Sequence, residues 1–287
     1  MGKIQILDER ISGRIAAGEV VERPASIVKE LAENSIDAGA TSIAIAISEG
    51  GIKSIRVSDN GSGIAKEDMP LTIIKHATSK IRSIDDLDRI YTMGFRGEAL
   101  ASIAAVSMMK IRSKTPESEL GCELSVRGGK VEHLHEIGLP DGTVILVENL
   151  FYNTPARLKF LKKPAAETAA ISAVVADLII SHPEIAFQYT SNGTVIYHSP
   201  GNANLLDAII SVEGMQLKPN LSEIDISLHD ISITGYLSMP SVSFKRNNGR
   251  VYVNTRPIRS KIAENAVINA YGQRLLKGSF PYYVLHI

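Results

Sequence analysis

Three polar residues with chemically useful side chains, Glu30, Asn34 and Asp37, stand four and then three positions apart. On a helix, where each residue turns the chain by about 100°, this spacing places all three within roughly 60° of one another. A carboxylate, an amide and a second carboxylate on one stripe suit a metal-bound nucleotide, because hard cations prefer oxygen ligands. A solvated helix face can carry the same pattern, so the stripe needs support from the rest of the chain.

Residues that typically begin and end helices stand at both ends of the stretch that carries this stripe. Pro24 suits a first helical position, residues 25–38 contain neither glycine nor proline, and Gly39 follows them. We therefore predict one helix over this stretch, with the apolar Val28 and Leu31 facing away from the polar residues.

The composition predicts a soluble globular chain. Its 287 residues suggest two domains, and 44% hydrophobic residues can fill their cores. The 31 basic and 31 acidic residues balance, so the net charge neither favours nor excludes nucleic acid. The single cysteine, Cys122, excludes an intramolecular disulfide and a multi-cysteine zinc site. We see no apolar run approaching the length of a membrane span and no signal peptide, so we expect a cytosolic protein without a membrane partner.

Helices and strands of the first half do not alternate as in a doubly wound fold. Alternating residues predict strands at 43–47 and 55–58, and helix signals follow at 83–91 and 97–106. Between residues 106 and 150, strand-like runs alternate with turns. We expect an α+β fold in which a helical layer covers one face of a mostly antiparallel sheet of at least four or five strands.

The second half continues with a long helix and a smaller α+β domain. The patterns predict helices at 165–180 and 260–276, a hairpin at 187–197, and strands at 250–254 and 281–287. We expect one domain over residues 1–200 and a second over 201–287. Because the sequence stops inside an apolar strand, we also expect a fragment of a longer protein.

The phosphate-binding motifs that are present or missing limit the kinds of nucleotide site that the chain can have. Neither Gly-x-x-x-x-Gly-Lys-Ser/Thr nor a Gly-x-Gly-x-x-Gly between strand and helix occurs, which excludes P-loop and Rossmann sites. The chain instead has Asp59 before Gly61 and Gly63, then His-Ala-Thr-Ser-Lys at 76–80, Gly-Phe-Arg-Gly-Glu-Ala-Leu at 94–100 and a Gly-Thr pair ending at Thr143. Each of these segments is weak evidence alone, because turns and helix starts use the same residues.

In this order, the motifs resemble the Bergerat (GHKL) nucleotide-binding fold shared by gyrase, heat-shock chaperones, histidine kinases and MutL. Four segments are similar to MutL mismatch-repair proteins in particular, namely residues 15–25, 76–80, 94–100 and 150–160. The resemblance is dense over residues 10–160 and thinner beyond, through Val251 to Arg256. It implies a GHKL α/β sandwich followed by a smaller α+β domain of the ribosomal-protein-like, or transducer, type that is truncated at its C-terminus.

The resemblance implies ATP and Mg²⁺ as cofactors and gives the stripe its roles. Glu30 would be the general base that deprotonates the attacking water, and Asn34 would hold Mg²⁺ through its amide oxygen. Asp59 would accept the adenine amino hydrogen, with Thr143 supporting the same base edge. Asp37 would only buttress the site.

Phosphate binding would fall to glycine-rich and helix-start segments. Gly61 and Gly63 would let the backbone approach the nucleotide closely. The other residues that the resemblance implies in ATP binding are Thr78, Ser79, Lys80, Phe95, Arg96, Gly97, Glu98, Ala99 and Leu100.

The resemblance further implies a slow ATPase switch of mismatch repair. ATP would order residues 64–96 and the N-terminal residues, and two copies would then dimerise around DNA and engage a mismatch-recognition protein of the MutS type. Between Lys245 and Lys261 there are six basic residues and no acidic one. Candidates for contact with the DNA backbone are Arg157, Lys159, Arg256 and Arg259. The protein would work in the cytoplasm at the nucleoid, or in the nucleus if eukaryotic.

One departure from the family concerns hydrolysis. Family members carry a lysine for the γ-phosphate in a His-Pro-x-Lys motif beyond the last strand seen here, so we expect this sequence to bind ATP but hydrolyse it poorly. Any endonuclease activity would also lie outside it.

Two alternatives remain. Another GHKL ATPase, such as a type II topoisomerase subunit, a chaperone or a kinase, is disfavoured by the segments 94–100 and 153–157. A non-hydrolysing DNA-binding scaffold is disfavoured by Glu30, because a scaffold needs no base.

Overall fold

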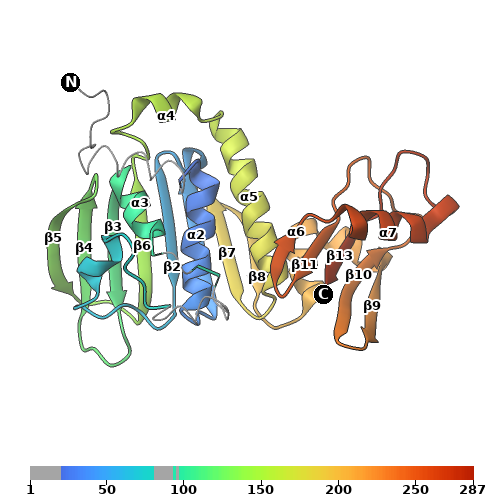
Figure 1. Cartoon of the computed structure of the whole chain (residues 1–287), viewed down its shortest axis with the longest axis horizontal. Helices are drawn as coiled ribbons and strands as arrows, with labels where there is room; N and C mark the ends of the chain where they lie inside the picture. The colour runs from blue at the N-terminus through green and yellow to red at the C-terminus, as the bar shows by residue number, and fades with distance from the viewer. Residues whose placement is uncertain (1–20, 81–92, 95–96) are drawn as a thin grey trace, which may run out of the picture. The chain divides into compact units, whose positions relative to one another are not determined.

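A computed structural model of the chain describes residues 21–80, 93–94 and 97–287 (Figure 1). Two compact units divide the chain, and each is described by itself. The first holds the described part of Met1–Val175 together with Ala186–His198, and the second holds Ala176–Ile185 and Ser199–Ile287. The helix predicted at 83–91 lies outside the described residues.

The described strands of the first unit form one eight-stranded sheet in the order β5-β4-β3-β6-β2-β1-β7-β8. Antiparallel ladders join β1 to β2, β2 to β6, β6 to β3, β3 to β4 and β4 to β5, whereas β1 and β7 pair in parallel. The strands are β1 (Ser42–Ser48), β2 (Ser54–Asp59), β3 (Met108–Lys114), β4 (Gly121–Arg127), β5 (Lys130–Ile137), β6 (Gly142–Glu148), β7 (Ala186–Ser191) and β8 (Thr194–Pro200). The predicted antiparallel sheet is therefore confirmed, and it is wider than expected.

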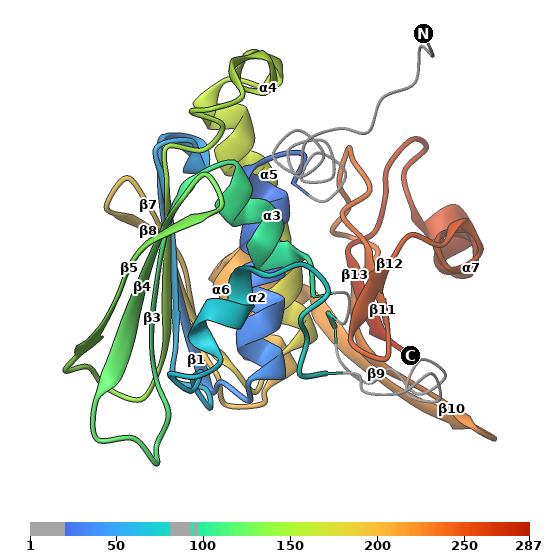
Figure 2. The ribbon, with the colours of Figure 1, turned by 60° about the vertical axis from the view of Figure 1, so that its left-hand side comes forward.

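Helices α2 (Pro24–Asp37) and α3 (Ala99–Ala105), and the part of α5 (Pro164–Ser181) that belongs to the first unit, lie on one face of this sheet (Figure 2). The cause is visible in β1, where Ile43, Ile45 and Ile47 are buried while the alanines between them are only half-buried. Successive side chains of a strand point to opposite faces, so the isoleucines form one apolar surface for the helices. The α+β class and the helical layer that the sequence predicts are confirmed.

The helix α5 corrects one sequence-based expectation. Its 18 residues are long and apolar enough to cross a membrane by length and composition, although we expected no run approaching that length. Burial accounts for part of this apolar character: Ile171, Val175 and Ile179 are fully buried, although only 44% of the helix is buried in all. A core helix needs such a composition to pack against a sheet.

The second unit contains a five-stranded sheet in the order β12-β11-β13-β10-β9, counted over the described residues. Strand β13 pairs in parallel with β11 and antiparallel with β10, so it lies inside the sheet. The elements are α6 (Leu205–Glu213), β9 (Leu221–Leu228), β10 (Ile231–Ser238), β11 (Arg250–Val253), β12 (Arg256–Ile258), α7 (Lys261–Tyr271) and β13 (Tyr283–His286).

Both faces of this second sheet are packed. On one face, Tyr252 and Val284 join Ile209 of α6 in a buried cluster. On the other face, Val251 and Leu285 pack with side chains of α7. Alternate residues of the central strands therefore supply two cores.

One predicted helix was too long. The helix expected at 260–276 ends at Tyr271, and a short 3₁₀ turn, Gly272–Arg274, follows it. Gly272 has φ 53°, in the left-handed region that ends helices. We overlooked this glycine because the apolar pattern runs on beyond it.

Candidate functional site

The polar stripe of α2 forms as predicted. Glu30 and Asn34 lie one turn apart and are half-buried, and Asp37 is the last residue of the helix. The opposite face of the helix is fully buried and includes Ile27, Leu31 and other apolar residues. The stripe therefore faces away from the core, as an accessible site requires.

Asp59, the last residue of β2, is held beside α2 by two hydrogen bonds. Its Oδ2 accepts from the Ser35 hydroxyl over 2.7 Å, and its Oδ1 accepts from the Gly61 amide over 2.9 Å. Both donors fix the orientation of the carboxylate, and each oxygen retains acceptor capacity for a ligand. Ser35 was missed by the sequence analysis, although a buried serine on an otherwise apolar helix face is a signal of a polar partner.

Thr143 lies directly beside Asp59, because β2 and β6 pair these two residues in register. Its hydroxyl contacts Ser113 Oγ over 2.8 Å, and Ser113 Oγ accepts from the Ile64 amide, also over 2.8 Å. Ser113 is thus a buried connection between β3, β6 and the loop after β2. We did not predict it, because a serine within a strand pattern carries no mark of its neighbours.

Contacts within the chain require glycine at positions 61 and 63, which lie at this end of the sheet. A Cβ on Gly63, where φ is 71°, would stand 2.1 Å from the Lys114 carbonyl oxygen, and one on Gly61 would stand 2.8 Å from the Ala38 carbonyl oxygen. Real Cβ atoms do not approach so closely, so glycine is required at both positions. Close approach of a nucleotide, which we predicted from the sequence for both glycines, stays a prediction beside this structural need.

Gly142 gives the sharpest stability prediction at this edge. Its φ is 111°, and a Cβ there would stand 2.1 Å from the Asp59 carbonyl oxygen. We expect Gly142→Ala to lower the free energy of unfolding by about 1–3 kcal/mol or more, measured by urea unfolding. The control is Gly138→Ala, where nothing lies within 4 Å of an added Cβ. Equal stability of the two variants would contradict this account.

The segments before and after residues 81–92 meet at the C-terminal end of α2. Lys80 Nζ donates to Asn34 Oδ1 over 2.9 Å and to Asp37 Oδ2 over 2.6 Å. The amides of Met93 and Gly94 also donate to the Asp37 carboxylate, over 3.0 and 3.2 Å. Asp37 therefore holds these two segments at the end of α2, which is compatible with the buttressing part that we predicted for it.

The other described residues predicted to bind phosphate lie in the segments 76–80 and 97–100. Thr78 Oγ1 accepts from the Lys80 amide over 3.2 Å, and Ser79 is exposed. The Gly97 carbonyl accepts from the amide of His76, which has a left-handed φ of 65°. Glu98 immediately precedes α3, and Ala99 and Leu100 begin that helix; Phe95 and Arg96 lie outside the described residues.

Glu33, on the same helix, has a perturbed acidity. Its pKa is raised from 4.5 to about 7, mainly by burial; Lys29 opposes the rise, and the charges of Glu30 and Asp37 add to it. The carboxyl group therefore keeps its proton in the folded chain up to a pH at which the unfolded chain has lost it.

This shift gives a pH-dependent prediction. Between pH 4.5 and about 7 the folded chain binds a proton at Glu33 that the unfolded chain does not, so this residue makes stability fall as pH rises. Glu33→Gln should remove that contribution. We measure the free energy of unfolding of both proteins with denaturant at several pH values. The value for the variant minus that for the unsubstituted chain should increase as the pH rises from 4.5 to about 7 and stay constant above that. A stability difference that stays flat or shrinks as pH rises would contradict the assignment.

The candidate DNA contacts fall in both units. Arg157 and Lys159 belong to α4 (Pro155–Phe160) in the first unit, and the guanidinium of Arg157 lies 5.9 Å from the Phe151 ring centroid. Arg256 and Arg259 are exposed in the second unit.

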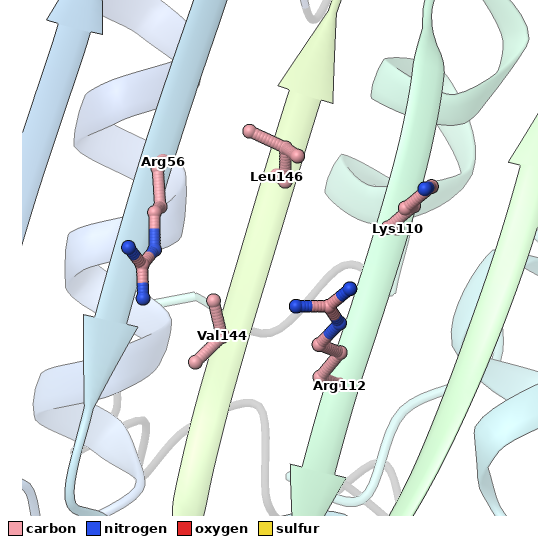
Figure 3. A pocket seen from close by; sticks show the side chains of 5 residues that line it. All are labelled: Arg56, Lys110, Arg112, Val144 and Leu146. Carbon is pink, nitrogen blue, oxygen red and sulfur yellow. The ribbon is translucent and has the colours of Figure 1, made fainter. Parts of the chain in front are cut away.

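A basic hollow lies on the other face of the first sheet. Figure 3 shows its lining, which contains none of the predicted site residues: Arg56, Lys110, Arg112, Val144 and Leu146. Arg56 and Lys110 both stand opposite Leu146 in the register of β2, β6 and β3. Asp59 and Thr143 are each an odd number of residues from these positions along their strands, so they point to the helix-covered face.

No group of three or more His, Cys, Asp or Glu side chains that could hold a metal ion occurs among the residues that the structure describes. Asn34 as a magnesium ligand stays a prediction; its single amide oxygen fits a cation that takes its other ligands from phosphates and water.

Comparisons with known proteins agree with this geometry. Residues 22–143 match the family described as histidine kinase-, DNA gyrase B- and HSP90-like ATPase, and residues 209–287 match the C-terminal domain family of DNA mismatch repair proteins. The ATPase domain of Aquifex aeolicus MutL complexed with ADP is 29% identical, with a TM-score of 0.70 over 93% of this chain and 92% of that chain. A second solved structure, the N terminal domain of a DNA repair protein, is 28% identical, with a TM-score of 0.80 over 98% and 89%.

Curated relatives extend the match to the whole sequence. The DNA mismatch repair protein MutL of Lactococcus lactis subsp. cremoris is 45% identical over all of this chain, which covers 44% of that protein. MutL of Streptococcus uberis is 44% identical, with the same coverage. This chain thus spans a little under half the length of the relatives it matches. It has the GHKL ATPase fold and belongs to the MutL family of DNA mismatch repair proteins.

Proposed function

We propose that this chain binds ATP with Mg²⁺ at the stripe of α2 and hydrolyses it slowly, as the nucleotide switch of a mismatch-repair protein. The observation that carries the proposal is the pairing of Asp59 with Thr143 at a strand end beside the Glu30–Asn34 stripe. A base-recognising carboxylate and a general base with a metal ligand are the parts that an ATPase site needs. The ADP complex of the similar Aquifex domain supports a nucleotide as the ligand.

Adenine recognition would belong to Asp59. Ser35 and Gly61 hold its carboxylate, which accepts the hydrogen of the adenine amino group, while Thr143 supports the same base edge. A hydrogen bond to a charged group contributes about 1.5–3 kcal/mol. Guanine has a carbonyl at that position, so GTP is rejected.

Hydrolysis would belong to Glu30 and Asn34. Glu30 orients the attacking water and accepts its proton, a role typically worth about 10²–10⁴-fold in rate. Asn34 would hold Mg²⁺, which when bound would neutralise charge that develops on the phosphates. The phosphates are wrapped by Thr78, Ser79, Lys80 and the residues from Phe95 to Leu100.

The wider role follows from the family. ATP binding would drive dimerisation of two copies around DNA, and that state would engage a mismatch-recognition protein of the MutS type. Residues 1–200 would be the ATP-binding domain and 201–287 the smaller, transducer-like domain. Arg157, Lys159, Arg256 and Arg259 would contact the DNA backbone without reading its sequence. The protein would work in the cytoplasm at the nucleoid, a location that its bacterial relatives support.

Sedimentation and phosphate release together test this function. We expect the chain to release phosphate from ATP only with Mg²⁺, and to shift toward a dimer with a non-hydrolysable ATP analogue but not with ADP. Metal-independent turnover would reject the Mg²⁺ site. An unchanged sedimentation coefficient with bound analogue would reject the dimerisation switch.

A further inference from the structure

The ammonium group of Lys80 contacts the same amide oxygen to which the proposed function assigns a metal ion. Its Nζ is 2.9 Å from Asn34 Oδ1, the atom that would hold Mg²⁺, and 2.6 Å from Asp37 Oδ2. The side chains of Lys80 and Asp37 are only 20% and 7% exposed, so water screens this ion pair weakly.

Backbone amides also hold the Asp37 carboxylate in place. Its two oxygens accept hydrogen bonds from the backbone amides of Met93 and Gly94 as well as from Lys80. Asp37 ends α2, where the helix dipole disfavours a negative charge. A buried carboxylate in that place needs a cation, and Lys80 supplies it.

Gly94 lies next to this pair. A Cβ on Gly94 would stand 3.5 Å from Lys80 Nζ and 3.7 Å from Asn34 Oδ1, which are ordinary contact distances. The backbone of Gly94 therefore borders the position of the Lys80 ammonium.

We infer that Lys80 is a stand-in cation: in the nucleotide-free protein its ammonium occupies the metal position at Asn34, and Asp37 is the positioning residue that holds it there. The inference rests on the proposed ATP site. An ammonium and Mg²⁺ that contact the same oxygen are close neighbours of like charge and repel each other, so the two cations compete for Asn34 Oδ1. Binding of a metal-bound nucleotide moves Lys80 off Asn34.

This competition has a measurable consequence. Without metal, Lys80 supplies the positive charge that faces the phosphates, so nucleotide binding partly survives the removal of Mg²⁺. Without Lys80, the phosphates depend on the metal alone. Lys80 and Mg²⁺ are therefore negatively coupled, and typical couplings between sites lie in the range of about 5–150-fold.

A thermodynamic cycle tests the coupling. The Kd of ADP is measured with Mg²⁺ and with EDTA, for the unsubstituted chain and for Lys80→Met. We expect the ratio of the EDTA value to the Mg²⁺ value to be about 5–150-fold larger in Lys80→Met. Equal ratios in the two proteins would overturn the inference while leaving ADP binding, and hence the proposed function, intact.

Amine acylation followed by mass spectrometry tests the contact without any nucleotide. Asp37→Asn keeps an oxygen for the Met93 amide and removes the charge that holds Lys80. Acylation of Lys80 should become several-fold faster in this variant, while that of Lys114, paired with Asp141 over 2.5 Å, should not change. The same Lys80 rate in both proteins would overturn the resting contact.

The two experiments separate the possible failures. If ADP does not bind at all, the proposed function fails, and the acylation rates still decide whether Asp37 holds Lys80. If Asp37→Asn does not fold, judged by its circular dichroism, the cycle with Lys80→Met decides alone.

Discussion

Glu30→Gln is expected to bind ATP as tightly as the unsubstituted chain and to lose about 10²–10⁴-fold in turnover. Glutamine keeps the size of the side chain but cannot accept the proton of the attacking water. Because Glu30 would act on water rather than on the nucleotide, the Kd of a non-hydrolysable ATP analogue should stay unchanged. Single-turnover phosphate release and calorimetric binding measure the two quantities.

The matched control for this prediction is Glu33→Gln, which changes a carboxyl group on the same helix. That variant should keep its turnover, because the stripe of Glu30 and Asn34 is untouched. If Glu30→Gln turned over ATP within a factor of two of the unsubstituted chain, Glu30 would not be the general base. Equal losses in both variants would indicate a general disturbance of α2.

Asp59→Asn is expected to weaken ATP binding by about 10- to 150-fold, the range that corresponds to a charge-assisted hydrogen bond of 1.5–3 kcal/mol. Asparagine keeps one uncharged acceptor oxygen, and its Nδ2 group cannot accept from the Ser35 hydroxyl or the Gly61 amide, which both donate to Asp59. The variant therefore loses the negative charge and the fixed orientation of the group that would accept from the adenine amino group.

Calorimetric titration with ATP and GTP measures this loss. The unsubstituted chain should prefer ATP, and Asp59→Asn should narrow the preference, because the loss falls on adenine alone. Asp141→Asn, an exposed carboxylate in the turn before β6, serves as the control and should bind as before. An unchanged preference for ATP in Asp59→Asn would show that another group reads the base.

Local patterns predicted the elements that carry the site. Pro24 and Gly39 delimit α2, and its spacing correctly separated the stripe of Glu30 and Asn34 from the buried face. The alternation of isoleucines likewise predicted β1. These features depend on residues close together in the chain, which is why the sequence alone sufficed.

The contacts within the site depended on distant pairings and could not be predicted in this way. Asp59 meets Thr143 only because β2 pairs with β6 in one register. The ion pair of Lys80 with Asp37 joins a loop to a helix end, and neither residue carries a local sign of the other. The resemblance to the family supplied the roles of these residues, and the fold supplied their partners.

A crystal structure of the chain with Mg²⁺ and a non-hydrolysable ATP analogue tests the central claim most directly. We predict the adenine amino group at Asp59, the metal ion on Asn34 Oδ1, and Lys80 Nζ moved away from Asn34. Nucleotide bound elsewhere, for instance in the basic hollow of Arg56, Lys110 and Arg112 on the opposite face of the sheet, would contradict the account.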